Sequence, residues 1–510
     1  MKLETGTNSP EWLPNQDRSA GAGGTFVYLF KGKRLPPTAA DIMASYPWTE
    51  SSSVTTTTTV VATPDGDSDG ACAADNNNTP MTKFITAKPP SYYRKPLRTV
   101  TQWLKGKRRD DDAEGLWRIH DSLYDLTEFI ECHPGGSEWI RFTKGTDITE
   151  AFEVHHIGAR PEQLLPRYYI RAARSPRNVR LTFHKDGFYK TLKRRVAEKL
   201  TTVNNQPAQT SELILDSLLC GSFVLACLAL NWNSYLLAAL AGLLVAWTMN
   251  CAHNFLHRKD NWRMMAFNLA FFSYREWRVS HALSHHLYPN SKLDLEISFF
   301  EPFLCWFPSA AGKNLFQRFG SWVYGPLIYT TMCLAEVGKR LLETILTRKN
   351  TFYADDAIPV LLPLAMWVSS NSGIFDVLKI WFVIVQVAGL VFGAIGLHAA
   401  HHHPDTVHSG DSIPADIDFG VYQLAAIIDR TDLKGSQFKV LVGFGDHCLH
   451  HLFPTLDHGI LPQLYPILFE TCEEFQLEYR EQHWLQAVVG QHQQLARIEP
   501  RVYVPWKKVK

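Results

Sequence analysis

The chain has 510 residues, enough for more than one domain, and its 51 Lys and Arg residues nearly balance its 50 Asp and Glu residues. This balance gives no reason to expect a nucleic-acid partner. The nine cysteines are scattered singly without a CxxC pair, which favours reduced thiols over a disulfide framework. The first residues, MKLETGTNSP, lack the charged-then-apolar pattern of a signal peptide, so membrane insertion would depend on later segments.

Residues 1–95 are predicted to be a disordered leader. The stretch Ser51–Thr63 reads SSSVTTTTTVVAT, and an Asp-, Gly-, Ala- and Asn-rich run follows it through Asn78. Such a segment buries too little apolar surface to offset the entropy lost on ordering. We expect a solvated tail without chemistry of its own.

Residues 96–175 are predicted to form a compact α+β unit that binds a flat cofactor. Leu116–Ile119 and Ser122–Leu126 alternate like short strands. His133 is followed by Pro-Gly-Gly, which forces a tight turn and lets a flat group approach the backbone. A second histidine comes later, at His155 or His156, and two histidines on opposite sides of a pocket could ligate a haem iron.

The stretches LWRIHDSLYDLTEFIECHPGG and GTDITEAFEVHH resemble a cytochrome b5 domain. By that resemblance His133 and His156 are the axial ligands of haem b. His155 is the alternative ligand if the loop is one residue shorter.

Residues 176–211 form a basic linker before residues 212–475, which are predicted to be an all-α membrane domain. Such a flank marks the cytoplasmic side by the positive-inside rule. Leu213–Leu230 and Tyr235–Cys251 are each close to the ~20 residues that cross a bilayer, and Asn231–Ser234 between them is polar. A buried soluble hairpin is the alternative, but the near absence of charge favours a transmembrane hairpin.

Three further apolar stretches compete for the second hairpin: Trp322–Val337, Ile358–Ser370 and Leu378–Leu397. If all three stretches crossed the membrane, the histidines after residue 397 would lie on the opposite side of the membrane from the histidines before residue 290. A single histidine cluster could not form in that arrangement. Trp322–Val337 has basic flanks and contains Pro326, so we expect it to lie in the interface. The prediction is therefore four spans in two hairpins beneath a cytosolic cap of histidine boxes.

Eight histidines fall in three short groups beside apolar segments, and they predict a metal site. Their spacings of three and four residues place imidazoles on one helix face. Eight ligands are too many for one tetrahedral zinc, whereas a dinuclear site uses them naturally. Ionisable clusters beside membrane spans are costly and usually functional. The groups are His253 and His257; His281, His285 and His286; and His447, His450 and His451.

Carboxylates near these groups could orient the imidazole rings; they are Asp260, Asp294, Glu296, Asp446 and Asp457. A further run, His398-Ala-Ala-His401-His402-His403, follows the last span. The position of this run at a helix exit, on the same face as the three groups, makes one or two of its histidines plausible ligands. We expect His402, His403 and His408 at the surface.

The patterns HxxxH, HxxxHH and HxxHH, with WRVSHALSHHLYPN and DHCLHHLFPTLDHG around them, resemble the membrane fatty-acid desaturase superfamily, whose boxes hold two non-haem irons. By that resemblance His401, which follows a pair of alanines after the last span, is a further metal ligand, like the extra histidine of that superfamily. With the b5 domain in front, the whole arrangement resembles the cytochrome b5-related proteins. Two departures stand out: fused front-end desaturases generally have Gln where this chain has His447, and two residues rather than three between His281 and His285.

The resemblance implies O2-dependent dehydrogenation of an acyl lipid or acyl-CoA in the endoplasmic reticulum membrane. Electrons would come from NADH-cytochrome b5 reductase through the haem, with the b5 domain, the boxes and the tail (residues 476–510) in the cytosol. A lipid hydroxylase on the same scaffold is one alternative. The other is a membrane-anchored electron carrier with an inactive desaturase half.

Overall fold

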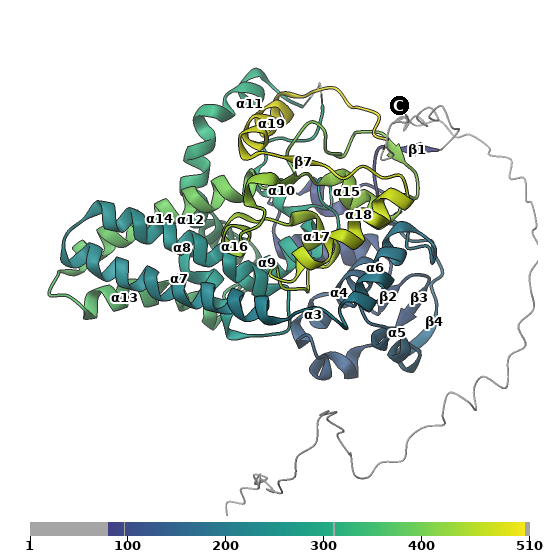
Figure 1. Ribbon diagram of the computed structural model, residues 1–510, viewed down its shortest axis with the longest axis horizontal. Coiled ribbons are helices and arrows are strands. Elements are labelled where there is room, and N and C mark those ends of the chain that lie inside the picture. Colours follow the sequence, from purple (N-terminus) through teal and green to yellow (C-terminus); the bar gives the residue numbers. More distant parts are fainter. Residues whose placement is uncertain (1–79, 96, 310–311, 505–510) are drawn as a thin grey trace, which may run out of the picture. The chain divides into compact units, whose positions relative to one another are not determined.

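The computed structural model describes residues 80–95, 97–309 and 312–504 (Figure 1). The predicted disorder of residues 1–79 and the last residues of the predicted tail lie outside these ranges. For residues 80–95 the prediction of disorder is wrong. Strand β1 (Met81–Thr82) pairs antiparallel with β5 (Ile413–Pro414), and Tyr92, in a 3-10 helix, is 1% exposed.

The cytochrome-like unit is an antiparallel sheet covered by short helices. The sheet order is β2 (Trp117–Ile119), β3 (Ser122–Tyr124), β4 (Tyr169–Ala172), which confirms the two predicted strands. The Trp117 indole N–H donates to the Ile140 carbonyl at 3.0 Å inside a small apolar core. The helices of this unit are α2 (Val100–Asp110), α3 (Ser137–Phe142), α4 (Thr149–His155) and α5 (Arg160–Leu164).

The predicted linker contains a packed helix, α6 (Phe188–Lys199), rather than only solvated chain. Leu192 and Val196 are fully buried on it. The Tyr189 hydroxyl donates to the Leu452 carbonyl at 3.2 Å, far along the sequence. The linker therefore joins the two halves through a core contact.

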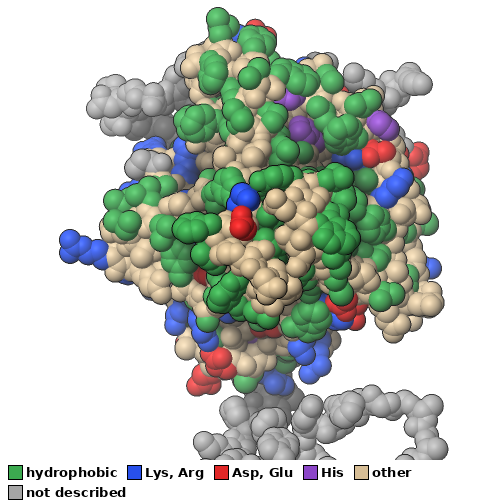
Figure 2. All heavy atoms as spheres, turned by 90° about the vertical axis from the view of Figure 1, so that its left-hand side faces the viewer, with side chains coloured by type: hydrophobic (Ala, Val, Ile, Leu, Met, Phe, Trp, Pro, Cys, Tyr) green, Lys and Arg blue, Asp and Glu red, His purple; other side chains and the backbone are tan. Residues whose placement is uncertain are grey.

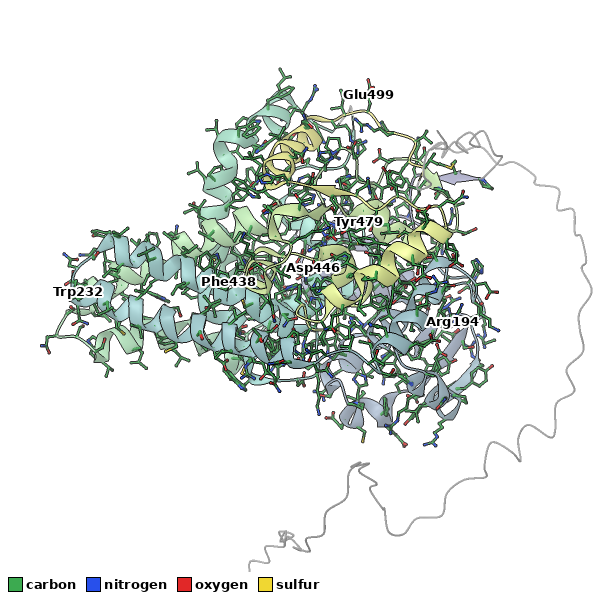
Figure 3. The ribbon with its side chains drawn as sticks, in the orientation of Figure 1. Arg194, Trp232, Phe438, Asp446, Tyr479 and Glu499 are labelled. Atoms are coloured by element: carbon green, nitrogen blue, oxygen red, sulfur yellow. The ribbon has the colours of Figure 1, made fainter. Side chains whose placement is uncertain are left out.

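Three described helices are long and apolar enough to cross a membrane: α7 (Gln206–Asn231), α8 (Tyr235–Leu256) and α14 (Ile374–Leu397). Helices α7 and α8 form the predicted first hairpin, and α14 packs beside α8 (Figure 1). The outer end of these helices, marked by Trp232 (Figure 3), shows mostly hydrophobic side chains and few charges (Figure 2). Apolar side chains such as Phe375, 85% exposed, suit contact with lipid.

The fourth predicted span is not confirmed. Within Ile358–Ser370 the structure has the end of a 3-10 helix, Ala354–Val360, and then α13 (Leu361–Val368) of eight residues. About 20 helical residues are needed to cross a bilayer, so α13 is too short to cross as one straight helix. It packs against α7 and α14 instead.

Helix α12 (Ser321–Thr347) covers the stretch predicted to lie in the interface, and it is not among the three candidate spans. It buries the charged residues Glu336, Arg340 and Glu343 on one face and exposes apolar side chains such as Val323 on another. This distribution suits an interfacial helix, which remains a prediction.

The remaining helices and strands cover the inner ends of the membrane helices. Residues 484–496 of the predicted tail form α19, which packs against α11 and α12, so they belong to the folded body. The elements are α9 (Tyr274–Trp277), a π-helix (Arg278–His285), α10 (Leu295–Phe300), α11 (Leu315–Phe319), α15 (Phe419–Ala426), β6 (Asp429–Arg430), α16 (Gln437–Gly443), α17 (His447–Leu452), α18 (Tyr465–Glu474), β7 (Glu481–Gln482) and α19 (Trp484–Ala496).

Candidate metal centres

The structure brings all nine predicted metal-ligand histidines together in two adjoining groups beneath the cap. The first group takes its members from α8, the π-helix, α17 and the residues that directly follow α8 and the π-helix. Its Nε2 atoms converge: His253 Nε2 lies 2.7 Å from that of His281 and 2.9 Å from that of His257. The group comprises His253, His257, His281, His286 and His450.

The second group comprises His285, His401, His447 and His451. The Nε2 atom of His401 lies 3.1 Å from that of His285, 2.7 Å from that of His447 and 3.2 Å from that of His451. A metal about 2.0–2.1 Å from each imidazole nitrogen leaves neighbouring ligand nitrogens about 3 Å apart. Both groups therefore have the ligand spacing of one metal ion each, and the donor set fits two irons.

A π-helix explains the extra residue in the second box. The His286 backbone N–H donates to the His281 carbonyl, five residues back, at 2.8 Å. In this wider turn, residues that are four and five positions apart lie on the same helix face. In an α-helix, residues three and four positions apart share a face. His281, His285 and His286 therefore all reach the two groups although the box is one residue longer than usual.

Carboxylates orient two of these rings. His281 Nδ1 contacts Glu296 at 2.8 Å, and His285 Nδ1 contacts Asp294 at 2.9 Å. Burial lowers the pKa of His285, but the two carboxylates outweigh it and raise that pKa to about 9. The carboxylates favour a proton on Nδ1, so a metal that binds at Nε2 would displace only the second proton of the ring.

Burial and neighbouring imidazoles hold the pKa of His286, His450 and His451 well below its usual range. These rings are therefore neutral at physiological pH, which is the form that binds a metal. Among the described residues no carboxylate forms a hydrogen bond with these three rings, so nothing offsets the lowering of their pKa.

The other predicted carboxylates contact different groups. Asp260 pairs with Arg278, Asp446 accepts from Tyr465, and Asp457 accepts from Ser211, Asn254 and Arg258. Figure 3 marks Asp446 at the start of the third box. The sequence analysis missed Gln423, whose Oε1 lies 3.1 Å from His451 Nδ1, because nothing in the sequence connects α15 to α17.

Of the histidines expected at the surface, His408 is only 1% exposed, so that expectation is wrong for it. His402 stacks on Trp306 with ring centroids 4.1 Å apart, and His403 is half-buried. None of the three belongs to either group of converging nitrogens found in the described part of the chain.

The two predicted haem ligands face one another across a gap. The ring centroids of His133 and His156 are 6.1 Å apart. His133 Nδ1 contacts the Gly136 carbonyl at 2.8 Å, and His156 Nδ1 contacts the Phe152 carbonyl at 2.9 Å, so Nε2 of each ring is left for a metal. Two iron–nitrogen bonds of about 2 Å each fit between the rings.

His155, the alternative ligand, packs elsewhere. Its ring lies 5.5 Å from the Trp139 ring, and its buried Nε2 has no hydrogen-bond partner among the described residues. Burial lowers the pKa of His155 to about 3 and that of His156 to about 4. Both rings are neutral, and the geometry favours His156 as the partner of His133.

We expect His156→Ala to remove the haem absorption band, because the iron loses one of its two axial ligands. His155→Ala, a change at the adjacent residue, should keep the band. Absorption spectra of the two purified variants, with protein and haem measured separately, test the assignment. A normal spectrum for His156→Ala together with haem loss for His155→Ala would reverse it.

A buried arginine joins the haem-binding unit to the second box. Arg278 is 1% exposed, and its guanidinium lies 2.7 Å from Asp260 Oδ1, 3.2 Å from Glu138 Oε2 and 4.8 Å from the Trp139 ring centroid. Its Nε donates to the Leu256 carbonyl at 3.2 Å. Glu138 and Trp139 belong to α3, directly after the His133 loop, so Arg278 couples the two candidate centres mechanically.

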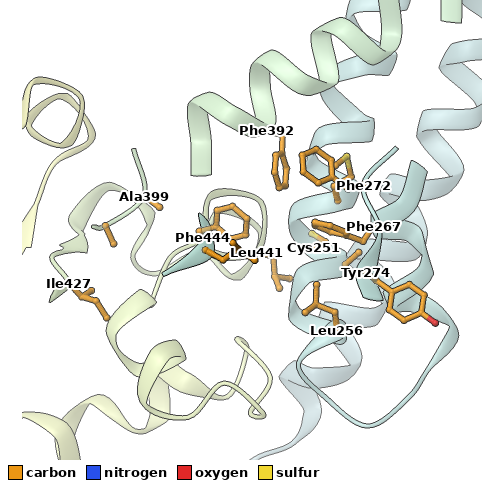
Figure 4. Packing of buried hydrophobic residues seen from close by; sticks show 14 of the residues in the cluster. Cys251, Leu256, Phe267, Phe272, Tyr274, Phe392, Ala399, Ile427, Leu441 and Phe444 are labelled. Carbon is orange, nitrogen blue, oxygen red and sulfur yellow. The ribbon is translucent and has the colours of Figure 1, made fainter. Parts of the chain in front are cut away.

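An apolar cavity ends at the histidines. Its lining contains His281, His285, His401 and His447 together with many apolar side chains. It also contains charged residues, namely Arg98, Glu276, Glu296, Glu336 and Lys339. Figure 4 shows Phe272, Phe392 and Phe444 in this wall; the rings of Phe272 and Phe392 are 5.1 Å apart. A cavity of this kind suits a hydrocarbon chain held next to the metals.

Two family models match the chain. The Cytochrome b5-like Heme/Steroid binding domain matches residues 102–174, and Fatty acid desaturase matches residues 230–483. No solved structure matches the chain. These matches confirm both resemblances drawn from the sequence.

Curated relatives match the chain over most of its length. The chain is 48% identical over 423 residues to a Cytochrome b5-related protein of Drosophila melanogaster, covering 82% of this chain and 97% of that protein. It is 24% identical over 417 residues to Acyl-lipid (8-3)-desaturase B of Dictyostelium discoideum, covering 73% of this chain and 88% of that protein. The chain therefore belongs to the cytochrome b5-related proteins and joins a cytochrome b5-like domain to a fatty acid desaturase domain.

Proposed function

We propose that the protein is a membrane desaturase of fatty acyl chains that holds haem b and two non-haem irons. The observation that carries this proposal is the pair of imidazole groups at the end of an apolar cavity, with the haem-ligand unit fixed to them by Arg278. The relatives named as acyl-lipid desaturases support the same chemistry. His133 and His156 would bind the haem, and the nine histidines of the two groups would bind the irons.

When bound, the irons would supply the O2 activation that side chains cannot provide, and the haem would deliver single electrons. The balanced reaction removes two hydrogens from adjacent methylenes and combines them with two electrons and two protons to reduce one O2 to two waters. The chain's own residues position these parts. Phe272, Phe392 and Phe444 exclude water and align the acyl chain, and Asp294 and Glu296 keep the ligand rings oriented.

The location and the electron source follow from the same proposal. The protein would lie in the endoplasmic reticulum membrane, with the haem domain and the boxes on the cytosolic side. NADH-cytochrome b5 reductase would reduce the haem. The haem domain would span residues 96–175 and the membrane domain residues 212–475. Helix α19, in the segment after residue 475, would pack against the membrane domain.

Lipid product analysis tests this function. The purified holoprotein is supplied with NADH, the reductase and membrane lipid, and the acyl chains are analysed by mass spectrometry. The proposal expects a product two hydrogens lighter than the substrate, formed only with O2 present. A hydroxylated chain would identify a lipid hydroxylase instead. Absence of product in protein that retains haem but binds no non-haem iron would identify an electron carrier.

We expect Gly396→Leu to abolish this product while both metal sites stay loaded. Gly396 lines the apolar cavity near the end of α14, and a Cβ there meets only Phe444 at 3.7 Å, so a leucine side chain fits the helix but extends into the acyl path. Gly338→Leu, at an exposed position of α12 with nothing within 4 Å, is the matched control and should keep full turnover. Normal turnover in Gly396→Leu would place the acyl chain elsewhere.

A further inference from the structure

Helix α4 of the haem-binding unit is held against the second box at both of its ends. In its first turn, Glu150 accepts a hydrogen bond at 3.0 Å from the hydroxyl of Tyr288, which comes just after that box. At its last residue, the ring of His155 lies 5.5 Å from the Trp139 ring, and Arg278 lies 4.8 Å from that same ring centroid. These contacts fix the position of His155 relative to the desaturase domain.

The ring of His155 has one nitrogen without a partner. A hydrogen bond joins this ring to the backbone carbonyl of Ala151, one helical turn back. Its Nε2 is buried and has no hydrogen-bond partner among the described residues, so the N–H that donates to Ala151 is on Nδ1. In a neutral imidazole with its proton on Nδ1, Nε2 carries a lone pair and accepts a hydrogen bond.

His257, in the first imidazole group, has the complementary nitrogen. Its Nε2 lies 2.9 Å from His253 Nε2, so this nitrogen faces the metal position. Its Nδ1 is buried and also has no hydrogen-bond partner in the described part of the chain. A neutral imidazole that binds a metal through one nitrogen carries its proton on the other. The Nδ1–H of His257 therefore needs an acceptor, which metal-binding histidines almost always have.

The two rings are neighbours across the junction of the two domains. The pKa of His257 is held well below its usual range by burial first, then by His281 and then by His155. Arg278, another neighbour, has a smaller effect on this pKa than His155 has. Because the interaction between two charges weakens with distance, this order places His155 among the near neighbours of His257.

We propose that His155 is a positioning residue for His257 and holds its Nδ1 through one bridging water. The water accepts from the Nδ1–H of His257 and donates to Nε2 of His155, so a donor and an acceptor that otherwise lack partners are both satisfied. Buried waters in proteins typically fill this role. The inference rests on the proposed function in one respect, that the first imidazole group binds iron.

This contact joins a predicted ligand of one centre to a predicted ligand of the other. His155 is bonded directly to His156, the predicted haem ligand, and His257 is a predicted iron ligand. A displacement of α4 therefore moves the outer partner of an iron ligand together with a haem ligand. Outer partners of metal ligands change metal affinity about 10–100-fold, so docking of the haem unit strengthens the binding of iron.

Chelator competition on the full-length holoprotein in detergent tests the proposal without any turnover. A ferrous-iron chelator is titrated, the non-haem iron that remains bound is measured, and haem is followed separately by absorption. We expect His155→Phe, which keeps the ring but has no nitrogen, to release non-haem iron at an about tenfold lower chelator concentration with an unchanged haem band. His155→Gln, whose amide reaches the place of Nε2, should restore most of the difference.

His120→Phe is the matched control. His120 also belongs to the haem-binding unit, but its Nε2 contacts Glu153 at 2.8 Å and it lies outside both imidazole groups. Its retention of non-haem iron should equal that of the unchanged protein. Equal loss of iron in His120→Phe, unchanged retention in His155→Phe, or no restoration by His155→Gln would overturn the proposal.

A second measurement does not depend on the irons. Thermal unfolding is recorded on the haem-loaded, full-length protein after removal of non-haem iron, for His155→Ala, His257→Ala and the double variant. Substitutions within one hydrogen-bond network are not additive, so we expect the double variant to be less destabilised than the two single effects together predict. Additive effects would overturn the proposal. Non-additive effects in a protein that never binds non-haem iron would instead contradict the proposed function and leave this contact standing.

Discussion

The His451→Ala variant should lose its non-haem iron and its lipid turnover while its haem spectrum stays unchanged. His451 belongs to the second imidazole group, its Nε2 is 3.2 Å from that of His401, and its ring stacks on His286 with centroids 4.0 Å apart. Removing it takes a ligand from one group and a packing partner from the other. We expect non-haem iron to fall by at least about tenfold, since even outer partners of metal ligands change affinity about 10–100-fold.

The matched control is His403→Ala. His403 follows the same run of histidines as His401, but it is half-buried and lies outside both groups. Iron and haem are measured separately on each purified variant, and turnover is measured with the reductase and lipid. Retained non-haem iron and normal turnover in His451→Ala would remove the third box from the metal site.

The sequence predicted which histidines lie close together in the structure, and their role as metal ligands stays a prediction. Imidazoles three or four residues apart on a helix must share a face, whatever surrounds them. The second box shows the limit of this argument. Its extra residue looked like a departure from the family pattern, and only the five-residue backbone hydrogen bond from His286 to His281 shows how the backbone absorbs it.

Hydropathy was less informative about the membrane helices. Ile358–Ser370 and Leu378–Leu397 have similar apolar composition, but the first stretch contains Pro359 and Pro363 and folds as two short helical pieces. A proline removes a backbone donor and limits a continuous helix. Moreover, apolar side chains that face other helices have the same composition as side chains that face lipid, so composition does not separate them.

Contacts between distant segments were beyond prediction. Residues 80–95 contain polar and proline-rich stretches, so composition predicted disorder, but their partners lie hundreds of residues away, as in the pairing of Met81 with Pro414. The same reason hid the burial of His408, because its neighbours Val407 and Ser409 donate to the carbonyls of the distant residues Ala425 and Asn290. Composition reports local preference, whereas these residues are ordered by tertiary contacts.

The Arg278→Gln variant should slow electron transfer from the haem to the irons while both centres stay loaded. Arg278 holds Glu138 and Trp139 of the haem-ligand unit against Asp260 of the desaturase domain. Arg278 is buried, but Asp260 is 46% and Glu138 is 16% exposed, and Glu138 keeps a second ion pair with Arg275. Loss of the Arg278 guanidinium therefore weakens the contact between the two domains without removing it, and we expect haem reoxidation to slow. Stopped-flow reoxidation of the reduced haem, with O2 and acyl lipid present, measures this step directly.

Arg263→Gln is the control for this experiment. Arg263 is a partly exposed arginine whose partners, Asp216 and Glu212, both belong to the desaturase domain, so its loss should leave haem reoxidation unchanged. Arg278→Lys should restore part of the rate, because lysine keeps the charge but not the paired hydrogen bonds of the guanidinium. Loss of non-haem iron in Arg278→Gln, with normal reoxidation in the molecules that keep it, would show that Arg278 supports the second box rather than the docking of the haem domain. Slow reoxidation with full iron would instead show that docking limits the delivery of electrons.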